Sequence, residues 1–246
     1  MKNLLTLCLT LLFLGTLCAQ DMKSDEILAK FLTTIGYKNS KAVQTIKMSG
    51  KLYQAGVEFS VTSMEKRPDQ SRMEMEIQGS KMIYSISGQS GWMVNPMLGS
   101  TEPQDLNEDL VKSSIKEDLR DPYGVWSNPF TDPAKNGTIV ELVGKEDMNG
   151  TPVYNIKLTF KDSTVVNYYI DSVNFLVLKL RTKIESQGQS FDAEGRFSDF
   201  RLMDNFMLPF QLESYVNGQL QLKFAIDTCE LNIPLEDELF RKPVNK

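Results

Sequence analysis

Over most of its length the chain alternates hydrophobic and polar residues with a period of two. In residues 73–77, for example, three apolar side chains are separated by two glutamates. Such alternation is typical of β-strands that bury one face and expose the other. From Thr45 onward the pattern predicts about eleven strands, and turns such as Asn149-Gly150 join them as antiparallel hairpins. The chain is therefore expected to form a mainly β barrel or sandwich.

Two stretches follow a helical spacing instead. In residues 24–34 the apolar side chains fall on one face, and we expect Ser24 to cap this helix and Gly36 to end it. In residues 98–121 apolar positions again lie near helical spacing, and Pro103 suits the first turn of a helix. These two segments would cover parts of a sheet built by the remaining chain.

A loop rich in turn residues follows, from Asp121 to Pro133. Its Trp126 and Phe130 are expected to pack on the rim of the sheet. Alternatively, they form part of a ligand mouth or a partner surface, since loops often carry such residues. After the last strand, residues 234–240 are expected to form a short helical turn.

Two motifs lie close together in the centre of the strand series. Lys66-Arg67-Pro68 ends one strand, and Gly88-Gln89-Ser90-Gly91-Trp92-Met93-Val94-Asn95-Pro96 forms a hairpin about twenty residues later. In this order they resemble the LolA/LolB family of periplasmic carriers of outer-membrane lipoproteins, which pairs a K-R-P strand end with a D-G-x-x-x-W-x-x-N-P hairpin. The resemblance is clearest from about residue 30 to residue 100. The chain departs from it by having Ser87-Gly88 where Asp-Gly is usual and by being longer.

The resemblance implies a half-open antiparallel β-barrel with short covering helices and an apolar cavity for acyl chains. The first helix would close the open end of the barrel. Arg67 would act as a gate by hydrogen bonds to the backbone of that helix. The side chains expected to line the cavity are Phe59, Val61, Met73, Met75, Ile77, Tyr84, Ile86, Trp92, Val94 and Leu178.

Methionine is abundant, with twelve residues in the chain, and five of them lie between positions 73 and 97. The unbranched thioether side chain adapts to irregular guests, which suits a cavity for lipid tails. The same side chains equally suit a packed protein core. The sequence leaves both interpretations open.

The N-terminus has the features of a cleaved signal peptide. Lys2 precedes an apolar run from Leu4 to Leu17, and cleavage is expected after Ala19. The predicted organisation is therefore a signal peptide at 1–19 and a single periplasmic domain at 20–246. Acylation of Cys18 as an outer-membrane lipoprotein is the less favoured alternative, because Leu17 stands where a small residue is expected.

Charge and composition exclude several other functions. The chain carries 27 basic and 32 acidic residues, so nucleic acid is not expected as a partner. It contains no histidine, which removes Ser-His and Cys-His catalysis and histidine-based metal sites. No glycine-rich phosphate loop stands between a strand and a helix. We therefore expect no cofactor, no metal and no enzymatic activity. Only Cys229 remains after cleavage, so an intramolecular disulfide is not expected.

The resulting hypothesis is a monomeric carrier that shields the acyl chains of outer-membrane lipoproteins. It would receive them from an inner-membrane exporter and pass them to an outer-membrane acceptor. The alternative is a related barrel that binds free lipid or senses lipoproteins. A third possibility is a scaffold that binds another envelope protein through an exposed apolar patch.

Overall fold

The computed structural model describes residues 22–77, 79–118, 120–186 and 188–243. The expected signal peptide and Cys18 lie outside these residues. Thirteen strands form a single sheet in the order β6-β5-β4-β3-β2-β1-β13-β12-β11-β10-β9-β8-β7. All neighbouring strands run antiparallel. The mainly antiparallel fold expected from the alternating pattern is thus confirmed, and the sheet is open, with β6 and β7 at its two edges.

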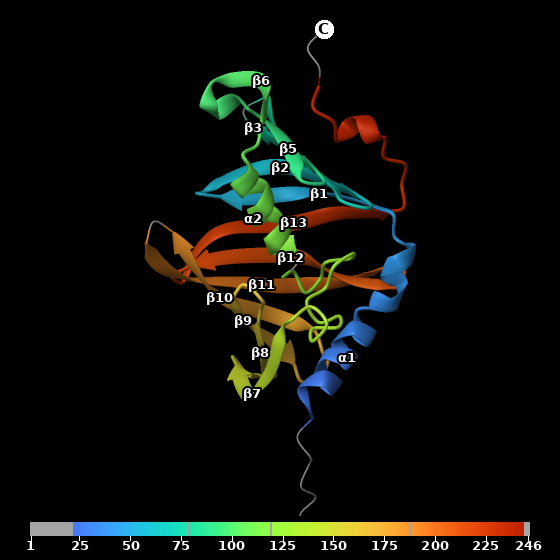
Figure 1. The fold of residues 1–246 in the computed structure, drawn as a ribbon, viewed down its shortest axis with the longest axis vertical. Helices are drawn as coiled ribbons and strands as arrows, with labels where there is room; N and C mark the ends of the chain where they lie inside the picture. Colours follow the sequence, from blue (N-terminus) through green and yellow to red (C-terminus); the bar gives the residue numbers. More distant parts are fainter. Residues whose placement is uncertain (1–21, 78, 119, 187, 244–246) are drawn as a thin grey trace, which may run out of the picture.

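The chain builds the sheet from its middle outward and then from the far edge back (Figure 1). The first meander consists of β1 (Thr45–Gln54), β2 (Val57–Lys66), β3 (Gln70–Ile77), β4 (Ser80–Ser87), β5 (Ser90–Asn95) and β6 (Ser100–Asp105). The second consists of β7 (Ile139–Met148), β8 (Thr151–Thr159), β9 (Val165–Asp171), β10 (Val177–Ser186), β11 (Gln189–Met203), β12 (Phe206–Val216) and β13 (Gln219–Leu231). Because β13 pairs with β1, the two meanders join in the centre of the sheet.

The segment after β5 differs from its prediction. Residues 100–105 form edge strand β6, and Pro103 lies within it instead of in the first turn of a helix. An edge strand tolerates proline because one side of the strand needs no hydrogen-bond donor. Helix α2 (Glu108–Asp118) begins later, where the side chain of Asn107 accepts a hydrogen bond from the Leu110 backbone N–H at 2.8 Å. This added strand contributes to the difference between thirteen strands and the expected eleven.

The first helix, α1 (Ser24–Thr34), lies close to its predicted position. Its N-cap residue is Lys23, so the expected cap at Ser24 was wrong. The Glu26 carboxylate instead accepts the Lys23 backbone N–H at 3.3 Å. Gly36 follows the helix in the left-handed conformation, with φ of 69°, as a helix-ending glycine does. The 3-10 helix η1 (Tyr37–Ala42) then leads into β1.

One end of one sheet face is covered by α1 and by the loop before β7. Phe130 of this loop is buried and makes edge-to-face contacts with Phe31 of α1 and Tyr168 of β9, with ring centroids 5.1 and 4.9 Å apart. Ile46 at the start of β1 belongs to the same cluster. Phe130 therefore belongs to the main core, and the loop is a packed cover.

The other face of the first meander is covered by the C-terminal segment, residues 232–240, which includes the expected short helical turn, η3 (Asp237–Leu239). Leu235 and Phe240 pack against Met64 of β2. Lys66 Nζ donates to the Leu235 carbonyl at 2.6 Å and pairs with the Asp237 carboxylate at 2.5 Å. This segment therefore covers the face of the first meander on which Met64 lies.

Candidate functional site

An apolar surface lies on the face of the first meander that the C-terminal segment leaves free. We call it the open apolar surface. Its buried members are Leu52, Val61 and Met75, and the partly exposed members are Phe59, Ile77, Met82, Tyr84, Leu222 and Phe224. It is on the same face as the α1-covered core, because Leu52 lies six positions after Ile46 on β1 and every second residue of a strand faces the same side.

Strand register brings these side chains together. Val61 of β2 pairs with Met75 of β3, and Met75 pairs in turn with Met82 of β4. Leu52 of β1 pairs with Phe59 on one side and with Phe224 on the other. Directly opposed side chains on one face lie within contact distance, so the members form a continuous apolar strip across five strands.

The strip is less well covered than the core at the other end of β1. Six of its nine side chains remain partly exposed. Met73, which extends it along β3, is 40% exposed. Contiguous apolar area of this kind on one face marks a place where an apolar ligand or a partner binds.

The structure brings together five of the predicted site residues, Phe59, Val61, Met75, Ile77 and Tyr84. Met73 and Ile86 lie on the same face, since Met73 pairs with Tyr84 and Ile86 follows Tyr84 by two positions. Leu178 is not with them, because it lies on β10 in the other half of the sheet. The alternation within one strand correctly indicated which side chains share a face.

Trp92 and Val94 lie on the opposite face from the open apolar surface. Trp92 pairs with Ser85 and Val94 with Ile83, whereas Met82, Tyr84 and Ile86 occupy the alternate positions of β4. Trp92 Nε1 and Ser85 Oγ both donate to the carbonyl oxygen of Phe240, at 2.8 and 3.0 Å. The tryptophan of the hairpin motif therefore anchors the C-terminal segment.

Four members of the open apolar surface were missed, namely Leu52, Met82, Leu222 and Phe224. Leu52 and Met82 belong to strands whose alternation was recognised. The alternation puts Met82 on the same face as Tyr84, and Leu52 pairs with Phe59, so both could have been predicted. Leu222 and Phe224 are on β13, which is far away in the sequence. Only the pairing of β1 with β13 places them here, and no local pattern encodes that pairing.

Arg67 lies at the other end of β2 and contacts the backbone next to α1. Its Nε donates to the Val43 carbonyl at 2.8 Å and its Nη2 to the Ser40 carbonyl at 3.2 Å. These carbonyls belong to the end of η1 and the residue after it, whereas the resemblance implied contacts to the covering helix itself. Trp126 of the loop donates from Nε1 to the same Val43 carbonyl at 3.0 Å, and its ring lies 5.6 Å from the Arg67 guanidinium. Arg67 thus joins β2, η1 and the loop.

Charged groups lie on the face opposite the open apolar surface. Glu74, between Met73 and Met75 on β3, accepts from Arg72 Nε and from Lys81 Nζ, each at 2.8 Å. Burial raises the pKa of the Glu74 carboxyl, but the bonds from Lys81 and Arg72 outweigh it, so the pKa lies below its ordinary value. The alternation along β3 thus separates a charged face from an apolar one.

Two other features, a metal site and a membrane-spanning helix, are not found among the described residues. Within them, no three carboxylate or cysteine side chains gather in a way that could hold a metal ion. None of the helices in this part of the chain has the length and apolar character needed to cross a membrane.

Comparison with known proteins finds similarity in structure only. No protein-family model matches the sequence, and no curated protein matches it significantly. A DUF1329 family protein from Desulfovibrio piger is similar in structure with a TM-score of 0.58 and 14% identity, over 87% of this chain and 97% of that one. A LolA superfamily protein from Nitrosomonas europaea gives 0.54 and 14% over the same shares. A domain assigned to outer membrane lipoprotein sorting, from Vibrio parahaemolyticus, gives 0.52 and 11% over 85% of this chain and 96% of that one.

Proposed function

Because this chain has the LolA-like fold, we propose that it binds acyl chains on the open apolar surface and carries them through the cell envelope. The acyl chains would belong to a lipoprotein or to a free lipid. The observation that carries the proposal is the strip of apolar side chains from Leu52 to Tyr84, which neither α1 nor the C-terminal segment covers. The expected signal peptide supports a location outside the cytoplasm.

Exposing an acyl chain to water costs much free energy, and an apolar surface removes this cost. Each methylene group kept out of water contributes about 0.8 kcal/mol, so a chain of about fifteen carbons would cost roughly 12 kcal/mol to carry unshielded. Methionine and aromatic side chains meet this need without demanding one fixed ligand shape. Met73, Met75 and Met82 supply adaptable contacts, and Phe59 and Tyr84 supply larger rigid ones.

Release requires that the affinity for the cargo can be lowered. We propose that Arg67 holds the segment after α1 in place through Val43 and Ser40 while the cargo is bound. Loss of these bonds would weaken the attachment of η1 to the end of β2. Such a carrier has one state with the Arg67 bonds formed and one with them broken. It would exchange its cargo when a partner stabilises one of these states. The partner would be an inner-membrane exporter or an outer-membrane acceptor.

The test is native mass spectrometry of the mature protein purified from the envelope of its own host, followed by extraction of the bound material. An acylated polypeptide would support a lipoprotein carrier. A protein-free lipid would support the alternative of a lipid-binding or lipoprotein-sensing barrel. Protein that is empty, and that fails to bind a fluorescent fatty acid in titration, would overturn the proposal.

A further inference from the structure

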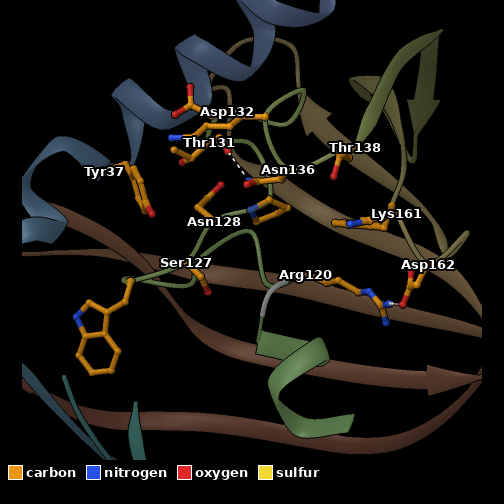
Figure 2. A pocket seen from close by; sticks show the side chains of 14 residues that line it. Tyr37, Arg120, Ser127, Asn128, Thr131, Asp132, Asn136, Thr138, Lys161 and Asp162 are labelled. Carbon is orange, nitrogen blue, oxygen red and sulfur yellow. Dashed lines mark hydrogen bonds and ion pairs between the residues drawn. The ribbon is translucent and has the colours of Figure 1, made fainter. Parts of the chain in front are cut away.

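A separate pocket of about 610 Å³ lies between the loop before β7, η1 and the turn from β8 to β9 (Figure 2). It shares no residue with the open apolar surface. Its lining includes Tyr37, Arg120, Trp126, Thr131, Lys135 and Lys161. The volume falls within the range of small-molecule sites in proteins.

One wall of the pocket is held rigidly. Figure 2 shows Arg120 and Asp162 pointing toward each other, with Arg120 Nη2 at 2.8 Å from the Asp162 carboxylate. The same nitrogen donates to Thr164 Oγ1 at 2.9 Å. The Arg120 carbonyl accepts from the buried Tyr168 hydroxyl at 2.8 Å. This wall is therefore anchored to the core of the sheet.

The pocket has more hydrogen-bond donors than its own residues satisfy. Lys135 and Lys161 are exposed and form no ion pair within the described part of the chain. The Thr131 hydroxyl is buried without a hydrogen-bond partner among these residues. Since Asp162 is occupied by Arg120, the Asp132 carboxylate is the remaining acidic group of the lining. The lining carries three basic side chains, Arg120, Lys135 and Lys161, and two acidic ones, so the pocket is positively charged although the whole chain has a net charge of −5.

A surplus of donors around two ammonium groups suits a ligand with several acceptor oxygens and negative charge. A phosphate group has this chemistry, but alone it would fill only a small part of the volume. The remaining walls include the aromatic side chains of Tyr37, Trp126 and Phe160. We propose that this pocket binds a phosphate group attached to a partly apolar body, either a phospholipid headgroup or a soluble organic phosphate.

Trp126 makes the proposal measurable. The chain has two tryptophans, and Trp92 lies on the opposite face of the sheet against the C-terminal segment. A Trp92→Phe variant therefore keeps Trp126 as its single tryptophan, in the wall of the pocket. This variant is titrated with glycerol 3-phosphate, with dihexanoylphosphatidylglycerol below its micellar concentration, and with dihexanoylglycerol, which has the same chains but no phosphate.

We expect a saturable change in Trp126 fluorescence with at least one phosphate-bearing probe and none with dihexanoylglycerol. Saturation by glycerol 3-phosphate identifies a soluble phosphate, and saturation by dihexanoylphosphatidylglycerol alone identifies a headgroup. Lys135→Gln and Lys161→Gln should each weaken binding by about tenfold. The control is Lys183→Gln, an exposed lysine on β10 outside the pocket lining, which should leave the affinity unchanged.

Equal binding of dihexanoylglycerol, absence of saturation with every probe, or unchanged affinity in both lysine variants would overturn the proposal. The result is independent of the proposed acyl-chain function. Glycerol 3-phosphate has no acyl chain, and Phe59→Arg, which alters the open apolar surface, should leave its binding unchanged.

Discussion

Arg67 and Trp126 donate hydrogen bonds to the same oxygen atom, the carbonyl of Val43, at 2.8 and 3.0 Å. One donor comes from the end of β2 and the other from the loop before β7. The guanidinium also lies 5.6 Å from the indole ring, within range of a cation–π contact. A single backbone group therefore connects the first meander to the segment that covers the second.

This relationship predicts the effect of Arg67→Leu. The variant removes a charged donor from the carbonyls of Ser40 and Val43, and we expect the free energy of unfolding to fall by about 1 to 3 kcal/mol. Val43 keeps the bond from Trp126, so the fold should persist. Hydrogen exchange should become faster in η1 and at the end of α1, as mass spectrometry of the exchanged protein would detect.

The same variant tests the gate. If Arg67 controls release, affinity for a fluorescent fatty acid should change little, whereas transfer of cargo to acceptor vesicles should change in rate. The matched control is Arg241→Leu, which removes an exposed arginine that pairs with Glu238. Identical transfer rates in wild type and Arg67→Leu would remove Arg67 from the mechanism.

The open apolar surface can be tested by adding charge to one side of a strand. Phe59→Arg and Met75→Arg each place a guanidinium among apolar side chains, and we expect fatty-acid binding to weaken at least tenfold. Phe59 is partly exposed, so its variant should remain folded, as circular dichroism would show. Met75 is buried, so its variant should also lose stability.

Glu76→Arg is the control for both, because Glu76 is exposed and follows Met75 on the opposite face of β3. It should bind the fatty acid as tightly as the wild type does. Equal weakening by Glu76→Arg would mean that binding does not distinguish the two faces. Loss of folding in Phe59→Arg would favour a packed core at this position.

Trp92→Phe tests the role of the hairpin motif. The variant removes the indole N–H that donates to the Phe240 carbonyl, while Ser85 still donates to that oxygen. We expect a loss of about 1 kcal/mol in the free energy of unfolding, measured in urea. Fatty-acid affinity should stay unchanged, because Trp92 faces away from the open apolar surface. A large loss of affinity would mean that the two faces are coupled.

The local sequence pattern predicted which side chains share a face of one strand. It did not predict which faces of neighbouring strands form the same side of the sheet. The alternation in residues 73–77 correctly placed Met73, Met75 and Ile77 on one face of β3. Trp92 was assigned to the same surface from the motif, yet the register of β4 with β5 puts it on the other side. Strand register is set by the turns and by which face of the sheet is buried. A shift of the register by one residue moves every side chain of the strand to the other face.

Long-range strand pairing explains the remaining differences between the sequence prediction and the structure. Leu222 and Phe224 reach the open apolar surface because β13 closes against β1, and the chain between these strands is long. The C-terminal segment was expected as a short helical turn, and this local feature is confirmed. That it covers Met64 and Trp92 depends on where the whole segment crosses the sheet, which local propensity does not specify.

We expect stability at acidic pH to depend on carboxylates that accept hydrogen bonds from cations on the charged face. Glu194 of β11 accepts from Arg181 Nε at 2.7 Å and from Arg196 Nε at 2.6 Å. Burial raises the pKa of Glu194, but the bonds from Arg181 and Arg196 outweigh it and hold the pKa below the ordinary value of 4.5. Such a group stabilises the fold above its unfolded-state pKa and loses this contribution as the pH falls through its folded-state pKa.

We therefore expect the free energy of unfolding to change little between about pH 6 and 8, because the chain has no histidine, and to fall below about pH 4.5. Glu194→Gln should be less stable than the wild type at neutral pH, and the difference should shrink toward pH 3. Urea unfolding at a series of pH values measures both quantities. Glu185→Gln, which changes an exposed glutamate on β10, should follow the wild-type profile. If Glu194→Gln does so as well, its ion pairs contribute nothing to the acid sensitivity of this sheet.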